Sequence, residues 1–187
     1  RAWREPSSEV CGKIQMKAVS RRSIQDFLER LGSYPRNEML FLLGGSAMIL
    51  LGSSRETMDI DYVGDDIHKN EFQIAVEKIA NELGLDTEAV PIEHFIPLPE
   101  GYEQRKIHIG QFGNVNVYII DPYSIALSKL DRGSDRDLND LVFLIQQNHI
   151  TLEELERITQ NALSHAHKFD FHPEILAHLQ ELKFRLK

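Results

Sequence analysis

Residues 39–63 decide the fold, and they read MLFLLGGSAMILLGSSRETMDIDYV. The apolar run 39–43 has the length of a buried strand and ends at two glycines, which allow a tight turn. Residues 46–51 then have the pattern of a short apolar helix. Residues 57–63 alternate strictly between the two sides of the chain, as in a strand with one buried face. The stretch therefore predicts a strand, a glycine turn, a helix and a second strand.

Helical and strand patterns continue on both sides of this stretch. Apolar side chains recur at helical spacing in 23–31 and 69–83, and a glycine follows each segment. After them the pattern predicts strands at 93–96, 105–111 and 114–120, then helices at 122–131, 134–147, 151–165 and 173–185.

This order of elements predicts the domain organisation. We expect an α/β (α+β) fold in which a mixed sheet flanked by helices forms the core over residues 16–121. An all-helical C-terminal region over residues 122–187 is expected to pack on that core. Residues 1–15 mix proline, serine and charge without periodicity, so we expect a loose N-terminal arm there.

The composition excludes several classes of protein. Of the 187 residues, 42% are hydrophobic and 27% are charged, which is ordinary for a globular chain. No apolar run approaches the roughly 18 to 20 residues that span a bilayer, so no membrane role is expected. The single cysteine, Cys11, cannot form an internal disulfide, and a reducing cytoplasm is the expected location.

The charge balance is acidic. Lys and Arg number 21 against 29 Asp and Glu, which gives a net charge of −8. Such a surface repels polyphosphate on average, so broad duplex DNA binding is not expected. A local cationic site remains compatible with this balance, because carboxylates at a metal site would contribute to the acidic surplus.

The glycine turn and the second strand combine two kinds of chemistry. Gly44 and Gly45 let the backbone approach a ligand, and the helix that starts at Ser46 points free N–H groups at any anion bound there. Asp59 and Asp61 project from one face of their strand, so their carboxylates can converge on one or two divalent cations. The sequence therefore predicts a phosphate seat beside a site for Mg²⁺ or Mn²⁺.

The combination is more specific than its parts, because acids that alternate along a strand usually form a solvated face. Leu43, Gly44 and Gly45-Ser46, followed after a short gap by Asp59-Ile60-Asp61, resemble the signature of the polymerase-beta-like nucleotidyltransferase superfamily. With Arg55, Thr57 and a downstream run of Lys, Arg and Asp, the chain looks like the AbiEii-like and MenT-like branch of small bacterial nucleotidyltransferases. Many members of that branch are toxins of toxin–antitoxin pairs.

This resemblance implies transfer of a nucleoside monophosphate from a metal-bound nucleoside triphosphate (NTP). The acceptor would be the 3′ end of a tRNA or a protein hydroxyl, and a cognate antitoxin or toxin would be a partner. Asp59 and Asp61 would hold the metal ion. The residues expected to bind the nucleotide are Gly44, Gly45, Ser46, Arg55, Thr57, Lys129 and Arg132.

The downstream charged residues leave alternatives open. Lys129 lies at the edge of the packed stripe of its helix, from which it can reach solvent or extend into a cleft; the resemblance favours the cleft. Asp137 has the place of a capping acid after Ser134, and Asp140 lies one turn later. Either acid can orient Lys129 or Arg132, or act as the base for an incoming hydroxyl.

Classical members of the superfamily also carry a third carboxylate on a later strand, which the toxin-like branch often lacks. Asn116 is the residue expected at that place, with Glu103 and Asp121 as weaker substitutes by position. An amide oxygen brings no negative charge, which puts a second metal ion in doubt. This departure keeps a second function open, namely a catalytically weakened nucleotide-binding or partner-binding protein of the antitoxin type.

Histidines gather towards the end of the chain, at His165, His167, His172 and His178. His165 and His167 lack the i, i+4 spacing of a metal-binding pair on a helix, so no metal site is expected there.

Overall fold

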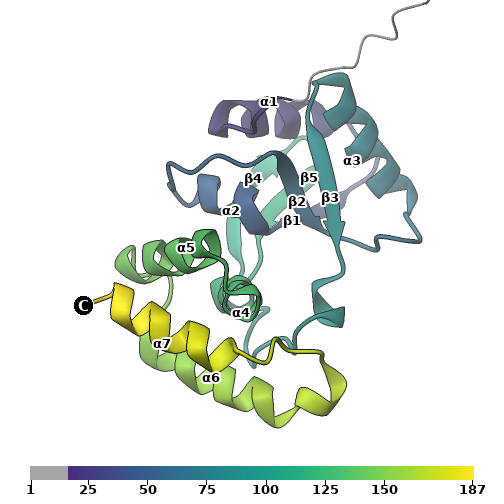
Figure 1. Ribbon diagram of the computed structural model, residues 1–187. Coiled ribbons are helices and arrows are strands. Elements are labelled where there is room, and N and C mark those ends of the chain that lie inside the picture. Colours follow the sequence, from purple (N-terminus) through teal and green to yellow (C-terminus); the bar gives the residue numbers. More distant parts are fainter. Residues whose placement is uncertain (1–16) are drawn as a thin grey trace, which may run out of the picture.

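The computed structural model describes residues 17–187, and this part of the chain forms a mixed α/β fold (Figure 1). The loose arm expected at residues 1–15 lies outside the described residues. A sheet flanked by helices adjoins a group of helices formed by the last third of the chain, which confirms the α/β (α+β) class. No helix within residues 17–187 is both long and apolar enough to cross a membrane.

The sheet has five strands in the order β3-β2-β1-β5-β4. β1 runs antiparallel to β2 and parallel to β5, while β2 is parallel to β3 and β4 is antiparallel to β5. The strands span Glu38–Leu42 (β1), Asp59–Val63 (β2), Asp86–Val90 (β3), Ile107–Phe112 (β4) and Val115–Ile119 (β5).

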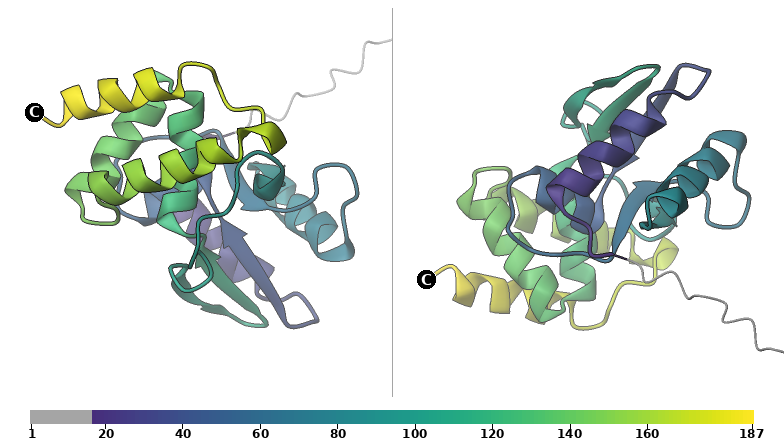
Figure 2. Two further views of the ribbon diagram at one scale, coloured as in Figure 1. Left: turned by 90° about the horizontal axis from the view of Figure 1, so that it is seen from below. Right: turned by 90° about the horizontal axis from the view of Figure 1, so that it is seen from above.

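The predicted strand, turn, helix and strand are present, since the short helix α2 (Gly44–Leu50) joins β1 to its neighbour β2. Two longer helices, α1 (Arg21–Leu31) and α3 (Glu71–Glu82), cover one face of the sheet (Figure 2). Side chains of Ser20 and Asn70 cap the first turns of these helices and fix where each begins. Their apolar stripes pack on inward-facing residues that include Leu40, Leu42, Ile60, Tyr62, Val115 and Val117.

Four helices follow the sheet: α4 (Pro122–Arg132), α5 (Asp135–Gln146), α6 (Leu152–Ser164) and α7 (Ile175–Arg185). They lie together beside the sheet (Figure 1). Their apolar side chains share one core with residues of β5, of α2 and of the turn before α2, namely Leu43, Ala47, Met48 and Ile119. The helical region is therefore packed directly on the α/β part.

The strand predicted at residues 93–96 is wrong. A 3-10 helix (Ile92–His94) follows Pro91, and the third strand is instead β3, with the sequence DTEAV. Asp and Glu are rare in strands, so this edge strand has no strong local signal. It forms because it pairs in register with all of β2. The second 3-10 helix in the described residues is Ala166–Lys168.

Candidate active site

β2 presents two aspartates on the face of the sheet that α1 and α3 leave uncovered. Ile60 and Tyr62 are buried in the core beneath those helices. Because successive side chains of a strand point to opposite faces, the partly buried Asp59 and Asp61 share the other face. The sequence predicted this placement of the two acids.

The glycine turn brings the start of α2 against Asp61. Gly44 has φ of +57°, and a Cβ atom on it would lie 2.1 Å from Asp61 Oδ2. A Cβ atom on Gly45 would lie 2.4 Å from Thr57 Oγ1. Without these atoms, the Gly45 N–H donates a hydrogen bond of 2.8 Å to Asp61 Oδ2. The N–H group that was expected to face a phosphate therefore holds a carboxylate.

Two hydroxyls of the expected nucleotide-binding set are engaged with the protein. The Ser46 hydroxyl is buried and lies 3.0 Å from the Leu43 carbonyl and 3.2 Å from the Asp61 carbonyl. The Thr57 hydroxyl donates to Asp59 Oδ1 at 3.2 Å. Ser46 thus anchors α2 to β2, and Thr57 orients Asp59.

Glu88 on β3 is the third carboxylate beside the two aspartates. It lies opposite Asp61 in the parallel register. One carboxylate oxygen from each of Asp59, Asp61 and Glu88 lies within 4.8 Å of the other two. Sequence reasoning missed Glu88 because no strand was assigned to residues 86–90; the alternation of Asp86 and Glu88 just after a helix was the available signal.

The expectation that Asn116 occupies the third-acid position is wrong. Asn116 lies on β5 opposite Met39, near the start of β1. Asp61 lies beside the other end of β1, where the Asp61 carbonyl accepts a hydrogen bond from the Leu43 N–H at 3.2 Å. One strand and most of the length of β1 therefore separate Asn116 from the aspartates.

Asp121 and Glu103, the weaker substitutes for the third acid, also lie outside the acidic cluster. Asp121 is buried, caps α4 and accepts from Arg105 Nε at 2.7 Å. Glu103 lies in an exposed turn, where it accepts from the Tyr102 hydroxyl at 3.3 Å. Neither residue belongs to the acidic cluster of Asp59, Asp61 and Glu88.

The negative charge of Asp61 is unfavourable in the acidic cluster of the metal-free protein. Burial first, and then the negative charge of Asp59, raises the pKa of Asp61 to about 6, although the Gly45 N–H and Lys129 act in the opposite direction. A bound cation would relieve this crowding. Three carboxylates form an all-oxygen donor set, which suits hard divalent ions such as Mg²⁺ and Mn²⁺.

Lys129 of α4 is the buried cation of the site. Its side chain is 2% exposed, and its Nζ lies 2.6 Å from Asp140 Oδ2 and 3.5 Å from Asp137 Oδ1. Arg55, from the loop before β2, also pairs with Asp140. The possibility that Lys129 reaches solvent is therefore wrong, because the two acids of α5 hold it inside the protein.

The carboxylate of Asp137, in the first turn of α5, is held by hydrogen bonds from neighbouring residues. Arg132 and the Ser134 hydroxyl each donate to its carboxylate at 2.7 Å, and the Asp137 N–H donates to Ser134 Oγ at 3.1 Å. Burial opposes ionisation, but these hydrogen bonds and the charges of Arg132 and Lys129 lower the pKa of Asp137 below its usual value. An acid held ionised in this way is a poor base, so its contacts favour the orienting role.

Residues of these elements line an open cavity of about 230 Å³. It lies where the α/β part meets α4 and α5, two helices that Figure 1 shows beside the sheet. Asp59 and Asp61 line it on the side of the sheet. Of the expected site residues, Ser46 and Asp140 do not line the cavity; each holds a lining residue in place. Four cations also line it: Arg55, Lys129, Arg132 and Arg136.

A carboxylate cluster that faces several cations across one cavity is suited to bind a metal-complexed polyphosphate. The model of a family described as "Nucleotidyltransferase of unknown function (DUF6036)" matches residues 22–175. This range includes the glycine turn, all three carboxylates and the four cations of the cavity. Neither the curated proteins nor the solved structures contain a match to the chain.

Proposed function

The chain belongs to the family of nucleotidyltransferases of unknown function (DUF6036), and from this premise we propose that it transfers a nucleoside monophosphate from an NTP to a hydroxyl group. The observation that carries the proposal is the convergence of Asp59, Asp61 and Glu88 beside a cavity that four cationic side chains line. Nucleotidyl transfer needs both parts, because the reacting triphosphate carries a metal ion and excess negative charge.

Asp59, Asp61 and Glu88 would hold one or two Mg²⁺ or Mn²⁺ ions. When bound, such ions neutralise the phosphate oxygens and make the α-phosphorus more electrophilic. The protein contributes rigidity to this site. The Gly45 N–H fixes Asp61 and the Thr57 hydroxyl fixes Asp59, so the carboxylates need little rearrangement when they bind.

The cations would bind the triphosphate. Asp140 holds both Lys129 and Arg55, and Asp137 holds Arg132, so these side chains are positioned before a nucleotide arrives. Arg136 lines the cavity and is exposed, and it forms no ion pair within residues 17–187. Its guanidinium is therefore available to the β- and γ-phosphates, and bidentate contacts suit such groups.

In the proposed reaction, the acceptor oxygen forms a bond to the α-phosphorus. The bond from this phosphorus to the bridging oxygen of the β-phosphate breaks, and pyrophosphate leaves with the negative charge that Lys129 and Arg55 offset. Glu88 is the most exposed of the three carboxylates and accepts the hydroxyl proton. Asp137 does not serve as this base, because its partners stabilise the ionised form.

For the acceptor we propose a tRNA 3′ end or a protein hydroxyl, within a toxin–antitoxin pair. The likeness of the motif to the AbiEii-like and MenT-like branch supports this choice. The net charge of −8 disfavours broad duplex binding and is compatible with one local contact at the cationic cavity. The second candidate, a nucleotide-binding protein without turnover, was based on Asn116, and Glu88 removes that reason.

Purified protein with Mg²⁺, each labelled NTP in turn, and either total tRNA or a protein extract would test the proposal. We expect a labelled product from wild type, and a loss of about 100-fold or more for Asp59→Asn and Glu88→Gln. Asp66→Asn, an exposed acid in the loop after β2, is the matched control and should keep wild-type activity.

Calorimetric titration with Mg²⁺ and a non-hydrolysable NTP separates the two candidates. Tight binding without product from any acceptor would favour the non-catalytic protein. No nucleotide binding at all would reject both.

A further inference from the structure

Two histidines and a glutamate converge at the start of α7, away from the nucleotide cavity. We propose that His172, Glu174 and His178 form a binding site for Zn²⁺ or a similar divalent transition-metal ion. One ligand atom from each lies within 4.8 Å of the other two. Two imidazoles and one carboxylate are the donors of open zinc sites, whereas Mg²⁺ prefers oxygen alone. This site therefore differs in chemical class from the carboxylate cluster of the sheet.

From the sequence, no metal site is expected among these histidines, because His165 and His167 lack the i, i+4 spacing of a metal-binding pair on a helix. The three residues do not share one regular helical face. His172 and Glu174 precede α7 (Ile175–Arg185), and His178 lies in its first turn. A turn at residues 173–174, in which the Ile175 N–H donates to the His172 carbonyl at 3.1 Å, leads into α7, so ligands at i, i+2 and i+6 meet. Helical periodicity does not reveal this spacing.

A backbone carbonyl orients His178. Its Nδ1 lies 2.8 Å from the carbonyl oxygen of Leu130, in the last turn of α4. A carbonyl can only accept, so Nδ1 carries the proton and Nε2 keeps a free lone pair. Metal-binding histidines are typically fixed by such an outer hydrogen bond. Gly133 makes room for the ring, because a Cβ atom there would lie 2.1 Å from His178 Nδ1.

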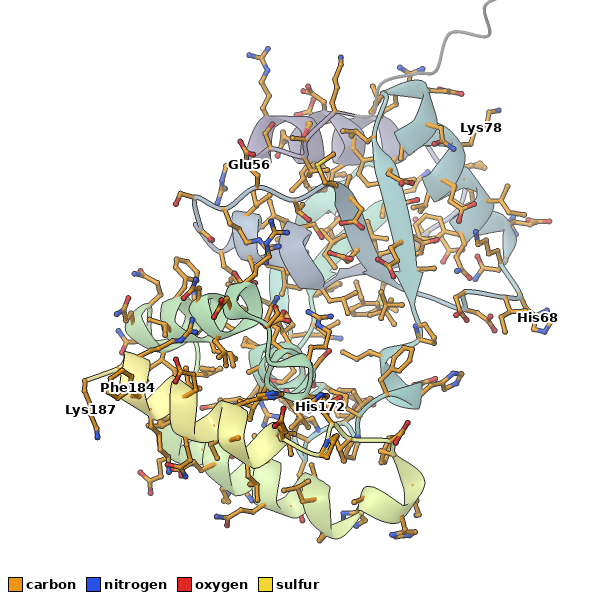
Figure 3. The ribbon with its side chains drawn as sticks, viewed as in Figure 1. Glu56, His68, Lys78, His172, Phe184 and Lys187 are labelled. Carbon is orange, nitrogen blue, oxygen red and sulfur yellow. The ribbon has the colours of Figure 1, made fainter. Side chains whose placement is uncertain are left out.

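His172 approaches from the segment that leads into α7, beside the end of α4 (Figure 3). Its backbone N–H donates to Asp131 Oδ1 at 2.7 Å, which fixes this segment on α4. Its Nδ1 accepts from the Glu174 N–H at 3.1 Å, so the proton of the neutral ring lies on Nε2, and a bound ion would replace this N–H at the Nδ1 lone pair. The centroids of the His172 and His178 rings lie 5.0 Å apart.

The cluster needs only a small contraction around an ion. Ligand atoms of a tetrahedral zinc site lie roughly 3.4 Å from one another, given metal–ligand distances of about 2.0–2.1 Å. The side chains of His172 and Glu174 are exposed, so their rotamers can close this gap without disturbing the core. Three protein ligands leave a fourth position for water.

A bound ion would stabilise the packing of α7 on the junction of α4 and α5. The far end of α7 is already held there, because Arg185 donates to Asp135 Oδ1 at 2.6 Å and to Asn139 Oδ1 at 2.9 Å. An ion at the near end would join the segment that leads into α7 to the first turn of α7, both of which already bond to α4 through His172 and His178. This proposal does not depend on the proposed function, since binding and stability can be measured without any nucleotide.

Titration of the chelator-treated full chain with ZnCl₂, followed by calorimetry and thermal unfolding, tests the site. With MgCl₂ in excess to occupy the carboxylate cluster, we expect one zinc ion per chain at pH 7.5 and a raised melting temperature. His172→Ala and Glu174→Gln should each weaken zinc binding by about tenfold or more. These two exposed positions are preferred, because His178→Ala would also remove the hydrogen bond to Leu130.

Three control variants show whether the zinc ion binds elsewhere. His167→Ala alters an exposed histidine outside the cluster, Asp59→Asn alters the carboxylate cluster, and Cys11→Ser removes the only thiol. All three should bind zinc like wild type. The proposal is overturned if wild type binds no zinc, if His172→Ala and Glu174→Gln bind it unchanged, or if one of the three controls abolishes binding.

Discussion

Lys129 is a fully buried lysine whose charge two carboxylates of the next helix balance. Its side chain is 2% exposed and that of Asp140 is 6% exposed. Removing such ions from water is costly, and the cost is met only while both partners are present. The same arrangement would place a cation beside the nucleotide, so a structural and a functional role coincide in one residue.

Substitution can separate these two roles. We expect Lys129→Met to lower the free energy of unfolding by about 3 kcal/mol, because Asp137 and Asp140 lose a buried partner. Lys129→Met with Asp140→Asn should recover most of this loss in urea unfolding, yet remain about 100-fold slower in nucleotidyl transfer. An active double variant would show that Lys129 serves stability alone.

Gly44 allows the start of α2 to lie close to Asp61, and Gly52 is the matched control position for substitution by alanine. Both have positive φ, +57° for Gly44 and +104° for Gly52, so alanine strains the backbone at either position by about 1 kcal/mol or more. Only at Gly44 would the added Cβ displace Asp61, because no atom lies within 4 Å of a Cβ on Gly52. We expect Gly44→Ala to lose Mg²⁺ binding in calorimetry and Gly52→Ala to keep it. Equal binding by both would contradict the role given to the turn.

Single residues differ in how far the sequence alone revealed them. The places of Asp59 and Asp61 followed from the alternation of a strand, a local property. For Lys129 the sequence left Asp137 and Asp140 open as partners, because both belong to another helix whose position the pattern of α4 does not define; the structure pairs Lys129 with both. The expected role of Ser46 failed for a similar reason, since its hydroxyl bonds to a carbonyl of the neighbouring strand.

At the scale of elements, the start of α5 links helix capping to the site. Ser134 caps the helix at the Asp137 N–H and also donates to the Asp137 carboxylate. That carboxylate in turn holds Arg132. The cap therefore positions a cation of the cavity.

A comparison of two caps tests this link. Ser134→Ala and Thr151→Ala, which removes the cap of α6, should each cost about 1 kcal/mol in the free energy of unfolding. Only Ser134→Ala should raise the KM for NTP, because only its cap contacts a residue that binds a cavity cation. Equal effects of the two variants on KM would separate capping from nucleotide binding.

Elements with strong local patterns were predicted and β3 was not. The strand–turn–helix–strand of residues 39–63 and the four C-terminal helices have clear periodicity. β3 is short and polar, and pairing with β2 creates it. Because β3 is not predicted, the third-acid position is assigned to Asn116 in the sequence. Glu88 is recognised only once its strand is paired with Asp61.

At the scale of the whole molecule, the α/β part and the helical region share one apolar core. Leu43 and Ile119 pack in the same cluster as Leu141 and Leu179. The cavity lies at this junction, with its carboxylates from the sheet and its cations from both parts. Changes in the charge of the cavity should therefore alter the stability of the molecule as a whole.

The pH dependence of global stability measures this coupling. The folded state raises the pKa of Asp61 to about 6 from its ordinary 3.8, so it binds this proton more tightly than the unfolded chain does. The stabilising contribution is fully present below pH 3.8 and is lost as the pH rises through about 6. At pH 7.5 the ionised carboxylate should cost about 1–3 kcal/mol in the metal-free protein.

The difference in stability between Asp61→Asn and wild type isolates this group from the other carboxylates. In EDTA, the variant should be more stable than wild type at pH 7.5, and the difference should shrink towards zero between pH 6 and pH 4. Mg²⁺ at 100 times its dissociation constant should stabilise wild type by about 2.7 kcal/mol at pH 7.5, and less below pH 6, where protons compete for Asp61. The variant should gain little from Mg²⁺. A difference that does not change with pH would mean that Asp61 ionises in the fold as it does in the unfolded chain, and the crowding of the carboxylates would then not drive metal binding.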